Sequence, residues 1–160
     1  MKKNIFINPT YKEFVLESLK LITIDSNEAE RSTAVIGDVV KIVILSLINS
    51  GIKANFKAQN IYFTENKKDF ITDFELYANK SLFHIIEAKG QTGLASAKDQ
   101  ITTQLKKSSC ENGCITDGFT WQFVRLNDAQ ELEYVGNPLL LEVHLDIIIN
   151  KIILTIPELC

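Results

Sequence analysis

The sequence predicts an α/β protein with a central mixed sheet of four or five strands flanked by helices. Segments with apolar residues at three- and four-residue spacing, typical of helices, alternate along the chain with segments of two-residue alternation, typical of strands. The chain has 160 residues, 46% of them apolar, which is enough to bury the core of such a fold. We therefore expect a single domain over residues 1–160.

Composition excludes several classes of protein. A charged fraction of 23% and three cysteines argue against a disordered chain and a disulfide-rich miniprotein. The net charge of -3 gives no overall basic signal, so any nucleic-acid site must be a local patch. The longest uninterrupted apolar runs, 42–45 and 147–149, are far shorter than the roughly 20 residues of a membrane span. Few, unpaired cysteines favour a reducing compartment, cytoplasmic or nuclear, and no membrane partner.

The N-terminal part predicts two helices. Residues 10–13 have the pattern of a capping box and begin a short helix that runs to about Leu21. A second helix is expected from about Glu28 to Asn49, where a Ser-Gly pair ends it. Apolar residues leave this second helix little polar surface, so we expect it to lie buried across the sheet.

Two-residue alternation begins at Ile52. We expect strands over 52–58 (continuing at 60–63), 70–78 and 82–89, separated by turns at 65–69 and 79–81. Next come a helix over 94–107 and short strands over 114–117 and 121–126. The last segment, 137–157, alternates like a strand in part, but its length and Pro138 favour a helix.

One charged cluster stands out. Asp73 lies at the end of one expected strand, and Glu87-Ala88-Lys89 ends the next. Glu87 and Lys89 are two residues apart on a strand, so their side chains share a face. Charges at the end of a buried strand cost desolvation unless they are paired or used. The alternative interpretation is an ion-pair cluster on the surface of a hairpin.

The hairpin register decides whether these carboxylates meet. A two-residue loop at 79–80 sets Asp73 opposite Ile86, on the face away from Glu87. A three-residue loop at 79–81 sets Asp73 opposite Glu87, and a bulge has the same effect. The three-residue loop agrees with the apolar pattern, because it also forms one apolar face from Phe74, Leu76, Leu82 and Ile86.

The residue types indicate a reaction. Two facing carboxylates bind a hard divalent cation such as Mg²⁺ or Mn²⁺. Such an ion polarises a phosphate and lowers the pKa of a bound water. A lysine close by can orient or deprotonate that water, or neutralise the charge that develops on the phosphate. This combination suits hydrolysis of a phosphodiester.

Asp73 followed by Glu87-Ala88-Lys89 resembles the PD-(D/E)XK nuclease superfamily. The sequence over 73–77 and 85–89 is most similar to the N-terminal nuclease domains of type I restriction motor subunits and to crinkler-type and fungal nuclease-like domains. The helix start at 27–31, Gln100, and the expected strand-turn-strand at 115–123 extend the resemblance over residues 27–126. Thr72 stands where the motif name has proline.

The resemblance implies a restriction-endonuclease-like fold and a nuclease dependent on Mg²⁺ or Mn²⁺, with DNA as a more favoured substrate than RNA. It implies that Asp73 and Glu87 bind the metal together with the Ala88 carbonyl, and that Lys89 assists the attacking water. It also implies supporting roles for Glu28 and Gln100. Glu28 and Glu30 are about 200° apart on a helix, so only one of them can point into the site.

Other features leave alternatives open. Basic side chains that could follow a phosphate backbone, or form a solvated face, are Lys98, Lys106, Lys107 and Arg125. Trp121 could stack on a base but suits a core position, and His84 falls on the apolar face of the hairpin. No recognition domain accompanies the motif, so substrate choice needs a homodimer, a partner subunit or structure-specific binding. The alternative function is a catalytically silent module that binds nucleic acid or protein.

Overall fold

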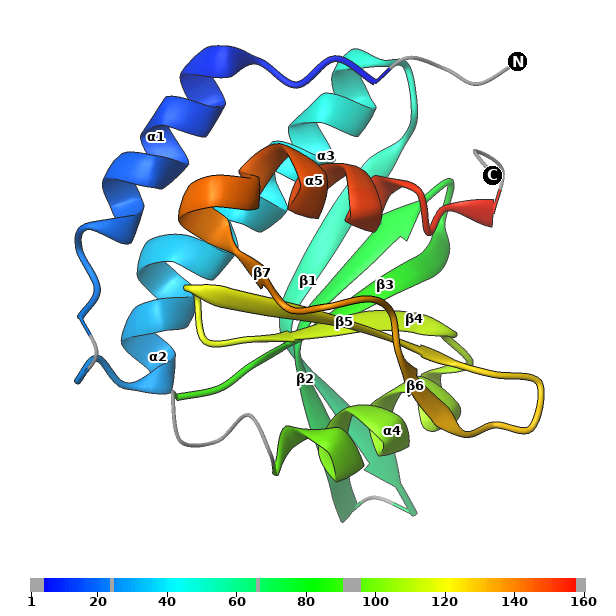
Figure 1. Ribbon diagram of the computed structural model, residues 1–160. Helices are drawn as coiled ribbons and strands as arrows, with labels where there is room; N and C mark the ends of the chain where they lie inside the picture. The colour runs from blue at the N-terminus through cyan, green and yellow to red at the C-terminus, as the bar shows by residue number, and fades with distance from the viewer. Residues whose placement is uncertain (1–4, 24, 66, 91–95, 158–160) are drawn as a thin grey trace.

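The computed structural model describes residues 5–23, 25–65, 67–90 and 96–157, and it has helices on both faces of one mixed sheet (Figure 1). The strands run in the order β1-β2-β3-β4-β5-β6, and β7 pairs with β5. All paired neighbours are antiparallel except β3 and β4, which are parallel and are connected through helix α4. The predicted α/β class is confirmed, but the sheet has seven strands instead of four or five.

The first helices follow the prediction, with two local differences. Helix α1 spans Pro9–Leu19 and is capped by Asn8, whose side chain accepts a hydrogen bond from the Thr10 amide, so the cap lies two residues before the expected one. The expected helix over 28–49 is continuous but composite. It comprises α2 (Glu28–Arg31), a π-helical turn η1 (Ser32–Ile36) and α3 (Gly37–Asn49).

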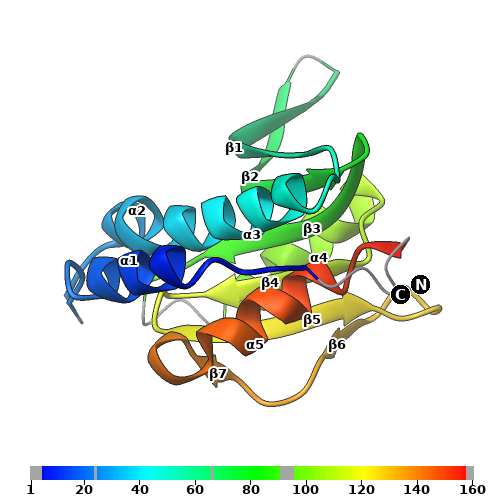
Figure 2. The ribbon, with the colours of Figure 1, turned by 90° about the horizontal axis from the view of Figure 1, so that it is seen from above.

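This composite helix lies in the core of the protein. Among the described residues, the stretch Glu28–Asn49 is the one helix long and apolar enough to cross a membrane, judged by length and composition. In the structure, 59% of its most apolar window is buried inside the protein, as in a core helix. Its partners are the sheet and helix α5, which Figure 2 shows on the same side of the sheet.

The hairpin of β2 and β3 determines where the charged cluster lies. Strand β1 spans Ala54–Thr64, β2 spans Lys67–Ala78 and β3 spans Ser81–Ala88. The turn has two residues, Asn79 and Lys80, both with positive φ as in the tight turns that match strand twist. The expected three-residue loop is therefore wrong. A bulge at Phe83 corrects the register, because Leu76 pairs with His84 while Tyr77 pairs with Leu82.

The bulge produces the arrangement that the apolar pattern predicted, with one exchange. Phe74 pairs with Ile86, and continuing this register by one residue sets Asp73 opposite Glu87. Phe83 takes the place expected for Leu82 in the large core, and Leu82 packs against a smaller cluster on the other face. The bulge therefore brings the two carboxylates together without exposing the apolar face.

The remaining elements complete two cores. Helix α4 spans Ala97–Ser108, β4 spans Asn112–Thr116, β5 spans Thr120–Leu126, and α5 spans Leu141–Ile153, which confirms the C-terminal helix. Two short strands were not predicted, β6 (Leu132–Tyr134) and β7 (Leu139–Leu140).

The larger core lies under α1, α3 and α5, and the smaller lies under α4. Trp121 and His84 are fully buried, so both are core residues.

Candidate functional site

Asp73 lies where β2 separates from β3. Its Oδ2 accepts a hydrogen bond from the Ala88 amide at 2.8 Å, and its Oδ1 accepts one from Gln59 Nε2 at 2.7 Å. The Asp73 side chain thus binds an amide of β3 beyond the last residue pair of the β2–β3 ladder. These two donors fix the position of a nearly buried carboxylate.

Glu87 is fully buried at the end of β3, close to Asp73. Its Oε1 lies 2.7 Å from Lys89 Nζ, and its Oε2 accepts a hydrogen bond from Gln104 Nε2 at 2.7 Å. Burial, and next the charge of Asp73, raise the pKa of Glu87 to about 7 although Lys89 and Gln104 act in the opposite direction. A carboxyl whose proton is lost near neutral pH is typical of functional sites and also occurs in structural ion-pair networks.

Lys89 is the cation of this cluster, and its side chain is only 15% exposed. Its Nζ also lies 3.7 Å from Glu28 Oε2, which comes from the first turn of α2. Burial alone would lower the pKa of Lys89, but contact with Glu87 and the charges of Glu28 and Asp73 hold it above its ordinary value. Lys89 therefore carries a positive charge in this arrangement.

The structure separates Glu28 from Glu30. Glu28 reaches Lys89, whereas Glu30 accepts a hydrogen bond from the Asn27 amide in a capping box at the start of α2. Of the two acidic residues that the sequence left open, Glu28 is therefore the one beside the cluster.

A cavity of about 420 Å³ opens next to Asp73 and Glu28. Its other lining residues come from α2, η1, α3, β1 and β2, and they are Ala29, Ser32, Gly37, Lys41, Phe56, Ala58, Gln59 and Phe74. A space of this size fits a ligand of small-molecule dimensions. The cluster is thus accessible from one side although Glu87 itself is buried.

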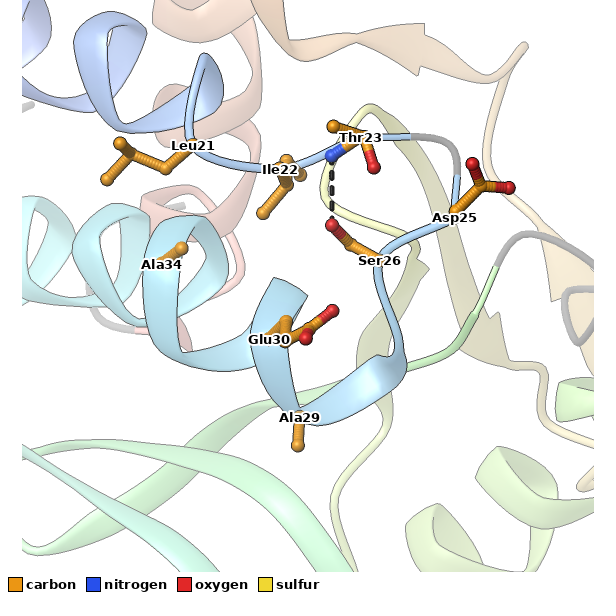
Figure 3. A pocket seen from close by; sticks show the side chains of 8 residues that line it. All are labelled: Leu21, Ile22, Thr23, Asp25, Ser26, Ala29, Glu30 and Ala34. Carbon is orange, nitrogen blue, oxygen red and sulfur yellow. Dashed lines mark hydrogen bonds between the residues drawn. The ribbon is translucent and has the colours of Figure 1, made fainter.

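A larger hollow, of about 660 Å³, lies between the α1–α2 connection and the start of the composite helix (Figure 3). Glu30 and Ser26 line it, and the Ser26 hydroxyl accepts a hydrogen bond from the Thr23 amide at 2.9 Å. Neither Asp73 nor Glu28 lines this hollow. The smaller cavity is therefore the one associated with the carboxylates.

The glutamine that contacts the carboxylates is Gln104 and not Gln100. Gln100 is exposed on α4, whereas Gln104 is fully buried and donates to both Glu87 and the Ile71 carbonyl. Gln104 follows Gln100 by four residues and so lies one turn further along the same helix. The structure thus brings Gln104 to Glu87 in place of the expected Gln100, and a role for Gln100 toward a substrate stays a prediction. Ala88 contacts Asp73 through its amide, and a role for its carbonyl stays a prediction.

The predicted basic residues do not form a single free basic face. Lys107 forms an ion pair with Asp69, and Arg125 forms one with Glu133 at 3.1 Å. Lys98 lies over the ring of Tyr134, with Nζ 5.9 Å from its centroid, and Lys106 is exposed. Two of the four charges are thus already neutralised on the protein.

A second buried carboxylate, Glu75, lies close to the cluster. The expected three-residue loop also sets Glu75 on the face of Asp73, Glu87 and Lys89, but Glu75 was not predicted as a site residue. It is fully buried and accepts hydrogen bonds from four side chains, namely Tyr62, Tyr77, Thr72 and Asn60. Burial alone would raise its pKa, but these four donors together hold the pKa of Glu75 below its ordinary value. Tyr77, which the sequence also sets on the face of the carboxylates, donates its hydroxyl to Glu75 at 2.6 Å. Glu75 therefore joins β1 to β2 and is saturated with hydrogen bonds.

The carboxylates of Asp73 and Glu87 fit a hard cation whose remaining ligands come from water and substrate. Within the described parts of the chain, no group of three or more His, Cys, Asp or Glu side chains could enclose a metal. Mg²⁺, however, often takes one or two carboxylates and completes its shell with water and phosphate oxygens. Glu87 Oε1 is buried without a well-aligned hydrogen bond, despite its proximity to Lys89, so it retains accepting capacity.

Comparison of the chain with protein-family models, with curated proteins and with solved structures finds no match.

Proposed function

We propose that the protein is a metal-dependent endonuclease of the PD-(D/E)XK type that hydrolyses phosphodiester bonds, with DNA as the preferred substrate. The observation that carries the proposal is the convergence of Asp73, Glu87 and Lys89 at the point where β2 separates from β3. The order of a hairpin, a helix and a parallel strand also supports a restriction-endonuclease-like assignment for this mixed sheet.

In this proposal Asp73 and Glu87 hold Mg²⁺ or Mn²⁺. When bound, the ion would polarise the phosphate and lower the pKa of a water molecule. Hydrogen bonds within the protein hold the two carboxylates in position. Gln59 and the Ala88 amide hold Asp73, and Gln104 holds Glu87. The Lys89 ammonium, kept charged by its acidic neighbours, would orient the water and neutralise charge growing on the phosphate.

The second candidate function is a nuclease-like module that binds nucleic acid or protein without cutting. The 2.7 Å contact between Lys89 and Glu87 favours it, because a lysine paired with a metal ligand competes with the cation. The net charge of -3 also favours it, since it weakens binding to a polyanion.

The test is cleavage of supercoiled plasmid, single-stranded DNA and RNA with Mg²⁺ or Mn²⁺. We expect Asp73→Ala and Lys89→Ala to lose at least about 100-fold in rate, the size of effect typical for removal of a charge-stabilising group. Lys20→Ala, at an exposed position directly after α1, is the matched control and should cut like the unaltered protein.

The outcomes separate the two functions. Metal-dependent cutting that both variants lose would support the nuclease. A folded protein that cuts none of the substrates would favour the binding module, and cutting that persists in both variants would show that the site lies elsewhere.

A further inference from the structure

The hairpin of β1 and β2 projects beyond the rest of the sheet (Figure 2). Strand β2 pairs with β3 only over 74–78, but its pairing with β1 continues to Lys67. We define the arm as residues 60–64 of β1 and 67–72 of β2. The arm begins one residue from Asp73 and Gln59, so a ligand that runs along the arm reaches the candidate catalytic cluster at its base.

Side-chain contacts hold the arm in place. The rings of Tyr62 and Phe70 stack, with centroids 4.3 Å apart and an 8° angle between their planes. Lys107 of α4 lies over Phe70 and forms an ion pair with Asp69. Tyr62 donates to the buried Glu75 at the base of the arm. The arm is thus anchored to the body, which reduces the entropy lost when it binds a partner.

The arm nevertheless leaves large apolar side chains in solvent. Phe63 is 65% exposed and Ile61 is 46% exposed. These two residues are two apart on one strand, and Lys68 pairs with Phe63 across the hairpin, so its side chain shares the face of the ring. Lys67 pairs with Thr64 and points to the opposite face. An exposed aromatic ring beside a lysine has the two components of a surface for single-stranded nucleic acid, a stacking platform and a charge for the backbone.

Local charge agrees with a polyanionic partner. The arm and its turn, residues 60–72, contain Lys67 and Lys68 against Glu65 and Asp69. The end of α4 adds two cations, Lys107, which pairs with Asp69, and the exposed Lys106. The arm together with the end of α4 is therefore locally basic within a chain of net charge -3, as a nucleic-acid site in this chain has to be.

We propose that the arm binds a single-stranded portion of the nucleic-acid substrate, with an unpaired base on Phe63 and a phosphate near Lys68. This inference rests on the proposed function and narrows its substrate class to nucleic acids with an unpaired region. Phe63 and Ile61 carry no side-chain donors or acceptors, so they cannot form the hydrogen bonds to base edges by which most sequence readout in a duplex groove occurs. A ring can stack on any exposed base, which favours unpaired nucleotides without sequence preference.

The test is binding of the full chain, in EDTA, to a fluorescent oligothymidylate and to a duplex of equal length, followed by anisotropy. Phe63→Ala should weaken binding to the single strand by at least about fivefold, the lower limit for loss of one stacking ring. Phe14→Ala is the matched control, because Phe14 is 62% exposed on α1, which packs on α3 and α5 away from the arm.

Lys68 has its own measurement. Replacing Lys68 by Ala should reduce the slope of log affinity against log salt by about 0.7, the contribution of one phosphate contact on a single strand. Circular dichroism would show that each variant is folded.

Three results would overturn the inference. They are equal affinities of Phe63→Ala and Phe14→Ala, binding to the duplex at least as tight as to the single strand, and no binding to either. Because the assay contains no metal, failure of cleavage does not affect it. A chain that binds through the arm but never cuts refutes the nuclease alone, and a chain that cuts regardless of Phe63 refutes the arm alone.

Discussion

The two sides of the sheet differ in what they bury. Under α1, α3 and α5 the interior is mostly apolar, and its buried ionisable side chains include His84 and Asp38. Under α4 the apolar cluster is small, and buried polar groups adjoin it, namely Asp73 and Glu75 of β2, Glu87 of β3 and Gln104 of α4. Apolar burial stabilises a fold, whereas buried charge costs free energy unless it is paired. The first region therefore maintains the fold, and the second is the place to expect chemistry.

The largest expected effect lies in the apolar region. Leu47→Ala would remove a fully buried side chain from α3, and we expect a loss of about 3 kcal/mol in unfolding free energy, typical of such truncations. Denaturant unfolding measures it. A loss below about 1 kcal/mol would mean that the region tolerates cavities, which contradicts the close packing assumed here.

The polar region should respond in the opposite direction. Glu87→Gln removes a buried charge, so at pH 8 we expect it to stabilise the metal-free protein by about 2 kcal/mol, in line with the raised pKa of Glu87. Thermal unfolding in EDTA would measure this. The matched change Glu142→Gln, at an exposed position on α5, should have almost no effect. Destabilisation by Glu87→Gln would show that its pairing with Lys89 outweighs the cost of burial.

The two regions should also oppose each other in their response to pH. Burial lowers the pKa of His84 to about 3, so between pH 6.5 and 3 only the unfolded chain takes up its proton, and stability falls as the pH falls. Burial and Asp73 raise the pKa of Glu87 to about 7, so between pH 4.5 and 7 the folded protein keeps a proton that the unfolded chain has lost. Stability from Glu87 therefore falls as the pH rises.

Variants separate these contributions between pH 5 and 6.5. Glu87→Gln should become more stable with rising pH by about 1.4 kcal/mol per pH unit, the slope for one proton. His84→Leu should instead lose stability with rising pH, because the effect of Glu87 is then no longer offset by the effect of His84. Parallel slopes in both variants would mean that other groups dominate this pH range.

The smallest effect compares two glutamines on one helix. Gln104→Ala removes a buried donor to Glu87 and to the Ile71 carbonyl, and should cost about 1 kcal/mol. Gln100→Ala, on the exposed side of α4, should change stability by less than about 0.5 kcal/mol. Equal effects would remove the distinction between the two positions.

Periodicity and end signals predicted most of the fold. The long apolar helix over 28–49, the β2–β3 hairpin and the C-terminal helix were all predicted from local patterns, and the structure contains them. Strands β6 and β7 were missed because they are short and form only through pairing with β5. Local sequence carries little signal for a strand that depends on a partner distant in the chain.

The candidate site was predictable in its residue types and less so in its details. Asp73, Glu87 and Lys89 stood out because charge at the end of an apolar strand is unusual. The bulge at Phe83 could not be distinguished from a longer loop, since both give the same pairing of the carboxylates. Selection of Gln104 over Gln100 depends on how α4 is rotated against the sheet, which the spacing of two glutamines in one helix does not determine.

The π-helical turn over Ser32–Ile36 affects how the candidate site responds to a change in chain length. A π turn contains one residue more than an α turn, and one residue corresponds to about 100° of rotation around a helix. Loss of that one residue would therefore leave an ordinary α turn, with Glu28 and the apolar face of α3 in nearly the same alignment. Homologous chains one residue shorter here should keep the acidic residue that faces Lys89, whereas a length change elsewhere in the helix between Glu28 and α3 would turn it away from the site.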